Sequence, residues 1–178
     1  HDGFGLTEKG KGQVRANVSK LKNAGITRIY ASPFTRTRES AELIAQELGI
    51  DASKIVYDDR LCEFDFGTLS GGTYAEFLEY EKAHMPSYAD AVPSGESYLD
   101  AKRRFGAFLY ALEADLKEEH ILIVAHGIAL ETLEAVVRGA DLEESKRIID
   151  LLDPKPAELR VLDFVPLPHN EGYELDLH

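Results

Sequence analysis

Apolar residues recur along this chain with two different spacings, which predict helices and strands in alternation. Val14, Val18 and Leu21 follow one another at steps of three and four residues, as on the buried face of a helix. The unbroken apolar run 121–125 predicts a strand buried on both faces. The helices predicted in this way cover about residues 7–23, 37–48, 74–84, 98–118, 128–138 and 142–152. The predicted strands are 26–31, 55–57, 121–125 and 159–165.

The order of these elements predicts the architecture. Strands that alternate with helices are typical of a largely parallel sheet with helices on both faces, a three-layer α/β sandwich. Gly25 and Gly49 follow the first two helices and are expected to end them. Residues 58–72 are predicted to form a loop and residues 93–95 a turn. In such a sheet, ligands bind at the carboxyl ends of the strands, where the next helices begin.

Composition and charge narrow the classes of function. The chain has 178 residues, of which 44% are hydrophobic, and this suits one domain with a sizeable core. The net charge of -12 opposes binding to nucleic-acid phosphates, so any phosphate ligand must be attracted by a local basic pocket. No apolar stretch approaches the length of a membrane span. Cys62 is the single cysteine, so no internal disulfide is expected and a reducing, cytoplasmic location is favoured.

Arg36 is the first candidate for chemistry, because it stands just beyond the predicted strand 26–31. A guanidinium group at that place could bind two phosphate oxygens at once. The alternative is that Arg36 and Arg38 are solvated residues at the start of a helix, where positive charge is unfavourable. A bound anion would offset that cost.

His126 and Gly127 form the second candidate site and directly follow the predicted strand 121–125. A histidine at the carboxyl end of a central strand can point into the ligand crevice. A glycine lets the backbone N–H approach a ligand, and the N-terminus of the following helix favours an anion. The alternative is a histidine whose ring bonds only to its own backbone.

Glu63 is the third candidate, a carboxyl group set among Leu61, Phe64 and Phe66. These apolar neighbours are expected to desolvate it. Desolvation raises the pKa of a carboxyl group and keeps a proton available near neutral pH. Asp65, two residues further on, is expected to be a surface carboxylate, although the residues alone do not rank Glu63 above it.

Four blocks of residues occur in an informative order. They are Leu6-Thr7-Glu8-Lys9-Gly10; Ser32-Pro33-Phe34-Thr35-Arg36 with Ser40-Ala41; Leu61-Cys62-Glu63-Phe64-Asp65-Phe66-Gly67 with Gly71; and Pro93-Ser94-Gly95-Glu96-Ser97 with Arg104, then Ile123-Val124-Ala125-His126-Gly127. In this order they resemble the histidine phosphatase superfamily, which includes the cofactor-dependent phosphoglycerate mutases and many small phosphatases. The resemblance implies a phosphoglycerate mutase-like fold and hydrolysis of a small phosphorylated substrate through phosphohistidine, with no metal or other cofactor.

The resemblance also implies roles for individual residues. They are phosphoryl binding by Arg36 and Gly127, hydrogen bonding to the phosphoryl oxygens by His126, and protonation of the leaving oxygen by Glu63 as general acid. Ser97 is expected to cap a helix, and Arg104 to form a structural pair.

One motif of the family does not occur in these 178 residues. It is Arg-His-Gly, which ends the first, central strand of the family and supplies the nucleophilic histidine. We expect this strand to lie upstream in a longer protein. Beside the strand 121–125 we expect an open slot, or another segment that wrongly fills it. The alternative nucleophile is His1, which precedes Leu6 too closely for the usual loop.

Other interpretations remain beside a phosphatase. Mutases of the family resemble one another in a Gly-Trp-x-Asp stretch and an Asn-Glu-Arg block, whereas this chain has no tryptophan and carries Cys62-Glu63-Phe64. A second alternative is a non-catalytic phosphate-binding module, fused to a larger protein. Residues 1–168 are predicted to form the domain and 169–178 a tail or linker. Residues 173–178 resemble a Leu-Asp-Leu-His stretch of isoleucyl-type aminoacyl-tRNA synthetases, which hints at such a fusion.

Overall fold

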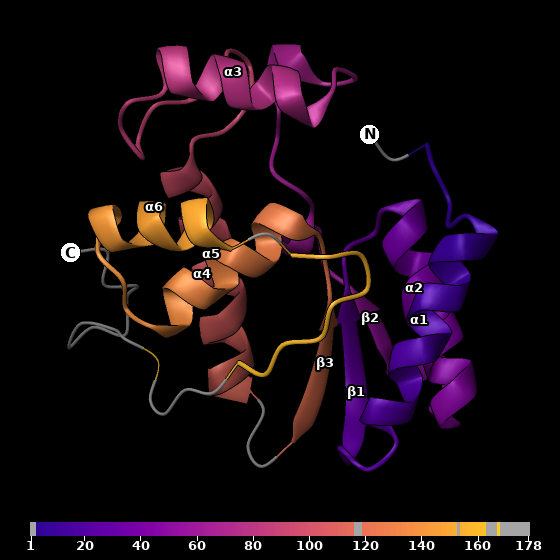
Figure 1. The fold of residues 1–178 in the computed structure, drawn as a ribbon. Helices are drawn as coiled ribbons and strands as arrows, with labels where there is room; N and C mark the ends of the chain where they lie inside the picture. Colours follow the sequence, from indigo (N-terminus) through magenta and orange to yellow (C-terminus); the bar gives the residue numbers. More distant parts are fainter. Residues whose placement is uncertain (1–2, 116–118, 153, 163–166, 168–178) are drawn as a thin grey trace.

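Three parallel strands and six α-helices make up the described part of the chain, residues 3–115, 119–152, 154–162 and 167 of a computed structural model (Figure 1). The strands are β1 (Ile26–Ala31), β2 (Ile55–Tyr57) and β3 (His120–Val124), in the order β2-β1-β3. The helices are α1 (Glu8–Leu21), α2 (Thr35–Leu48), α3 (Tyr74–His84), α4 (Tyr98–Asp115), α5 (Gly127–Val137) and α6 (Leu142–Leu151). The predicted α/β class is confirmed.

The ends of the helices follow local chemistry that the sequence shows. The Thr7 hydroxyl accepts a hydrogen bond from the Gly10 N–H (3.1 Å) and caps α1. Gly49 ends α2 in the left-handed conformation, with φ of 71°, where glycine is favoured. α2 begins two residues earlier than predicted, at Thr35. Residues 116–118 of the predicted fourth helix lie outside the described residues.

Two clusters of buried residues lie on opposite faces of the sheet. Ile29 and Ala31 of β1 pack with α1 and α2. Tyr30, between them, points to the other face, where its ring contacts the Phe108 ring of α4 edge-on at 5.6 Å between centroids. Helices α1 and α2 therefore cover one face and α4 and α5 the other, which gives the predicted three layers (Figure 1).

β3 is less buried than its apolar run predicted. Each of Ile121–Val124 is partly exposed, so the expectation of a strand buried on both faces was wrong. In the described residues β3 pairs with β1 on one side only. A cavity of about 380 Å³ is lined by both Leu122 and Ile123, which point to opposite faces. This cavity therefore runs along the unpaired edge of β3, where an open slot was expected.

The fourth predicted strand, 159–165, is a further correction. Residues 159–162 belong to no strand, and 163–165 lie outside the described residues. Val161 is 88% exposed. Residues 154–159, which include the first residue of the predicted strand, instead line the cavity, and the Asn17 side chain of α1 donates to the Ala157 carbonyl (2.7 Å). Alternation of apolar and polar residues does not by itself supply a neighbouring strand edge for pairing.

We expect Gly67→Ala to destabilise the fold by about 2 kcal/mol or more. Gly67 has φ of 46°, and an added Cβ would lie 2.3 Å from the Pro93 carbonyl oxygen. Gly12→Ala in α1 is the control: nothing lies within 4 Å of its added Cβ, so it should stabilise by about 0.5–1 kcal/mol. Urea unfolding followed by circular dichroism measures both. A Gly67→Ala protein as stable as the wild type would contradict the described loop packing.

Candidate active site

The parallel register of β1 and β3 brings Ser32 and His126 together. Ala31 pairs with Val124, and the Ser32 N–H donates to the Val124 carbonyl (3.0 Å), just beyond the last paired residues. His126 follows β3 and begins α5 as its N-cap. Its Nε2 atom lies 2.8 Å from the Ser32 hydroxyl oxygen, and both side chains are buried. The carboxyl ends of two neighbouring strands thus meet at one point.

Arg36 joins this pair from the first turn of α2. Its Nη2 atom lies 2.8 Å from Nδ1 of His126, so the structure brings the two candidates together at the same edge of the sheet. The Phe34 ring lies 5.2 Å from the guanidinium carbon and also 5.2 Å from the imidazole centroid. This cation–π contact partly compensates the placement of a positive charge at the start of a helix.

The partners of His126 fix its tautomer. A guanidinium group only donates hydrogen bonds, so Nδ1 must be the acceptor from Arg36, and the ring proton is left on Nε2 to face Ser32. Burial, and then the charge of Arg36, lower the pKa of the His126 imidazole to about 3. His126 is therefore a neutral ring at physiological pH. Its bonds are to other side chains, unlike the alternative of a histidine bonded only to its own backbone.

Glu63 reaches the same cavity from the loop that follows β2. Its Oε1 atom accepts a hydrogen bond from the Phe64 N–H (2.9 Å). Burial raises the pKa of the Glu63 carboxyl, against the opposing effect of that N–H, of Arg36 and of the Gly127 and Ala129 amides in the first turn of α5. A raised pKa keeps a proton on a carboxyl group nearer to neutral pH.

The structure separates the two acidic candidates of this loop. Asp65 is exposed and accepts a hydrogen bond from the Gly67 N–H (2.9 Å), whereas Glu63 lines the cavity. The Gly127 amide, which was expected to face a phosphate group, acts on the Glu63 carboxyl in this structure. Gly127 also lines the cavity, and the space beside its Cα is open.

Ser32 is the part of the site to which the sequence assigned no role of its own. It opens the Ser32–Arg36 block that resembles the family and follows a predicted strand directly. The two predicted structural roles are confirmed: the Ser97 hydroxyl accepts from the Asp100 N–H (3.1 Å) and caps α4, and Arg104 pairs with Glu96. His1, the alternative nucleophile, lies outside the described residues, as do 173–178.

Two further properties concern the described part of the chain as a whole. Within it, no three His, Cys, Asp or Glu side chains gather in a way that could hold a metal ion. None of the helices seen there combines the length and the apolar character needed to cross a bilayer.

The fold and the site define an α/β protein with an arginine, a neutral histidine and a partly buried carboxyl group at the carboxyl edge of its sheet. The model of the histidine phosphatase superfamily (branch 1) matches residues 1–166. The chain belongs to this family.

Relatives in sequence and in structure include both a protein named as a mutase and a protein named as a phosphatase. A probable phosphoglycerate mutase GpmB of Proteus mirabilis is 34% identical over 148 residues, which cover 80% of this chain and 67% of that protein. YhfR of Bacillus stearothermophilus has a TM-score of 0.67 and 28% identity, over 79% of this chain and 70% of that one. A mycobacterial glucosyl-3-phosphoglycerate phosphatase shares the fold, with a TM-score of 0.71 and 22% identity over 81% of this chain and 74% of its own.

We expect His126 to stay neutral at pH 5, where an ordinary imidazole is mostly charged, because its pKa is lowered to about 3. The ring nitrogen shifts in ¹⁵N NMR spectra should show a proton on Nε2 and none on Nδ1. In Arg36→Ala the pKa should rise towards the ordinary value, since the neighbouring positive charge is removed. An imidazole that titrates near pH 6.5 in the wild type would contradict this geometry.

Proposed function

We propose that the chain belongs to a phosphatase that hydrolyses small phosphomonoesters through a phosphohistidine intermediate. The observation that carries this proposal is the convergence of Arg36, Glu63 and His126 on one cavity at the carboxyl edge of the sheet. Membership of the histidine phosphatase superfamily supports an enzyme of phosphoryl transfer. The same edge of an open α/β sheet is the general position of ligand sites in such folds.

The nucleophile in this proposal is a histidine on a further strand that pairs with the unpaired edge of β3. The cavity extends along Leu122–Ala125 to His126, so a parallel strand placed there would end beside the imidazole. The family resemblance implies that this strand carries Arg-His-Gly. Its histidine attacks phosphorus, and a P–N bond forms while the ester P–O bond breaks.

The candidate residues supply the charge and the proton that this reaction needs. Arg36 binds the phosphoryl oxygens, where negative charge concentrates in the transition state. Glu63 gives its proton to the leaving oxygen. Water then attacks the phosphohistidine and passes a proton to the Glu63 carboxylate, which releases phosphate and restores both groups.

His126 needs a change of partner to contact the phosphoryl group. Both of its ring nitrogens face protein side chains in this structure, Nδ1 towards Arg36 and Nε2 towards Ser32. A phosphoryl dianion competes with His126 for the guanidinium group and also favours a charged imidazole. The proposal therefore includes protonation of Nδ1 when the substrate binds, so that the ring donates to a phosphoryl oxygen.

A mutase that moves the phosphoryl group between two hydroxyls is the second candidate. It is favoured by the 34% identity to a probable phosphoglycerate mutase. The two functions share the phosphohistidine step and differ in whether water or a second hydroxyl accepts the phosphoryl group. Cys62-Glu63-Phe64, in place of Asn-Glu-Arg, favours the phosphatase.

The full-length protein encoded by the gene should hydrolyse p-nitrophenyl phosphate, with the same rate after treatment with EDTA. We expect Arg36→Ala and His126→Ala each to lower kcat/KM by about 10²–10³-fold, because each removes stabilisation of the charge on the transferring oxygens. Arg38→Ala is the matched control. Its guanidinium lies 4.1 Å from the Tyr57 ring centroid, and the rate should stay near that of the wild type.

Three results would contradict the proposed function. Conversion of 3-phosphoglycerate to 2-phosphoglycerate much faster than its hydrolysis would favour the mutase. Phosphate binding without turnover would favour a non-catalytic module. Loss of hydrolysis after EDTA treatment that only an added metal ion restores would contradict the metal-independent mechanism.

A further inference from the structure

We propose that Arg104 and Glu96 are positioning residues for Glu63, because together they fix both ends of the short loop that carries this carboxyl group. The inference rests on the proposed function, in which Glu63 is the general acid. Neither residue lines the cavity, so we expect both to act on Glu63 through the loop. The charge of Arg104, which also lowers the pKa of His126, is kept in Arg104→Lys.

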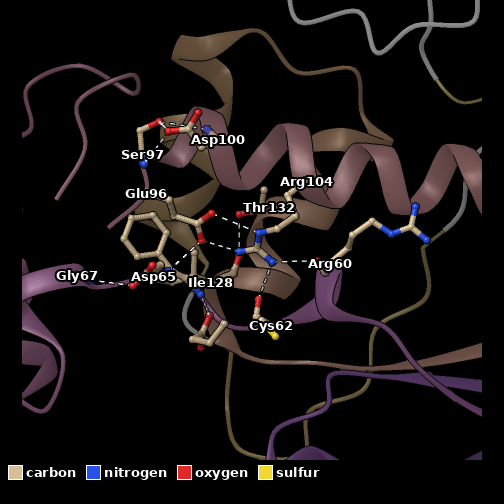
Figure 2. A network of polar contacts seen from close by, with 12 residues as sticks. Arg60, Cys62, Asp65, Gly67, Glu96, Ser97, Asp100, Arg104, Ile128 and Thr132 are labelled. Atoms are coloured by element: carbon tan, nitrogen blue, oxygen red, sulfur yellow. Dashed lines mark hydrogen bonds and ion pairs between the residues drawn. The ribbon is translucent and has the colours of Figure 1, made fainter. Parts of the chain in front are cut away.

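Arg104 holds the loop on the side that precedes Glu63. It extends from α4, and its Nη1 atom donates to the carbonyl oxygens of Arg60 and Cys62, both at 2.8 Å (Figure 2). One guanidinium nitrogen therefore fixes the backbone up to the residue immediately before Glu63.

Glu96 holds the loop on the side that follows Glu63. Its Oε1 atom accepts a hydrogen bond from the Asp65 N–H (2.9 Å), and its own backbone N–H donates to the Asp65 carbonyl (3.1 Å). The same carboxylate pairs with Nε and Nη2 of Arg104, so the two anchors form one connected network (Figure 2). The Glu96 side chain is 15% exposed and the Arg104 side chain 22% exposed, which limits the screening of this ion pair by solvent.

Only Glu63 and Phe64 lie between these anchors. The Phe64 side chain is buried and contacts the rings of Phe66, Phe77 and Tyr98 at 5.1–5.7 Å between centroids. The backbone is thus fixed at Cys62 before Glu63 and at Asp65 after it, and the packed Phe64 side chain holds the residue between them. Because burial raises the pKa of the Glu63 carboxyl, a loop free to move would let that carboxyl reach water and lose its raised pKa.

The network requires the planar fork of an arginine. Arg104 serves two carbonyl oxygens and one carboxylate through three different nitrogens. A lysine has one nitrogen and cannot hold that geometry. Arg104→Lys therefore keeps the positive charge and removes the paired hydrogen bonds to the Arg60 and Cys62 carbonyls, while Glu96→Gln keeps the size of the side chain and removes the ion pair.

The test compares an aryl ester with an alkyl ester in the full-length protein. p-Nitrophenolate leaves without a proton, whereas the alkoxide of glycerol 2-phosphate needs one from Glu63. We expect Arg104→Lys and Glu96→Gln to lower kcat/KM for the alkyl ester at least tenfold more than for the aryl ester. The alkaline limb of the pH profile should move to lower pH, since the acid must be protonated and its pKa falls.

Two controls separate positioning from general stability. Arg138→Lys disturbs an exposed ion pair to Glu134 on α5 and should leave both rates and the pH profile unchanged. Glu63→Gln should show the same preference for the aryl ester, and adding Arg104→Lys to it should not increase that preference. Hydrogen exchange should show weaker protection at the Asp65 amide in Glu96→Gln than in the wild type.

An equal loss for both esters, with the pH profile unmoved, would overturn the inference and leave Arg104 a structural residue. If Arg104→Lys does not fold, Glu96→Gln decides by the same comparison. In another outcome the wild type and Glu63→Gln behave as proposed, while Arg104→Lys and Glu96→Gln show no preference for the aryl ester over the alkyl ester. That result would contradict this inference and leave the proposed function intact. A wild type that hydrolyses neither ester removes the proposed function, and the inference with it.

Discussion

The parallel pairing of β1 with β3 is the constraint on which the site depends. Ala31 lies opposite Val124, so the residues that follow each strand meet at the same edge of the sheet. Ser32 and His126 are placed by this register, and α2 then starts where Arg36 reaches the imidazole. A slip of one residue would turn the side chains of a strand to the opposite face and separate these groups.

Burial at this edge shifts the pKa of the two titrating groups in opposite directions, and in each case it favours the neutral form. It lowers the pKa of the His126 imidazole and raises that of the Glu63 carboxyl. A guanidinium keeps its charge in a protein, so Arg36 places a fixed positive charge at the cavity although the whole chain carries -12. Arg36, beside the neutral His126, therefore supplies local attraction for a phosphate group at the carboxyl edge of the sheet.

Local patterns predicted most of the fold and part of the site. β1, β2 and α3 have the predicted limits, because their periodicity and the residues that end them are local. The rule that ligands bind beyond strand ends placed Arg36 and His126. The surroundings of Glu63 include the Gly127 and Ala129 amides of α5, which are distant in sequence, so no local pattern could rank it above Asp65.

Such local patterns could not predict which strands pair with one another. The alternation in 159–165 resembles a strand, yet 159–162 form none, since the segment before them crosses to the cavity beside β3. The half-buried state of Ile121–Val124 has the same origin, because the number of neighbours of a strand is set by the whole sheet. Arg104 was correctly predicted to pair, but its two backbone carbonyl partners depend on the path of a loop.

The central claim is that a phosphoryl group passes through a histidine in the cavity that Arg36, Glu63 and His126 line. The most direct measurement is rapid-quench trapping of the full-length protein with a ³²P-labelled phosphomonoester during turnover. We expect a labelled protein that is stable in alkali and loses its label in acid, as a phosphorus–nitrogen bond does, with much less label in Arg36→Ala. A label stable in acid, or steady turnover with no labelled protein, would contradict it.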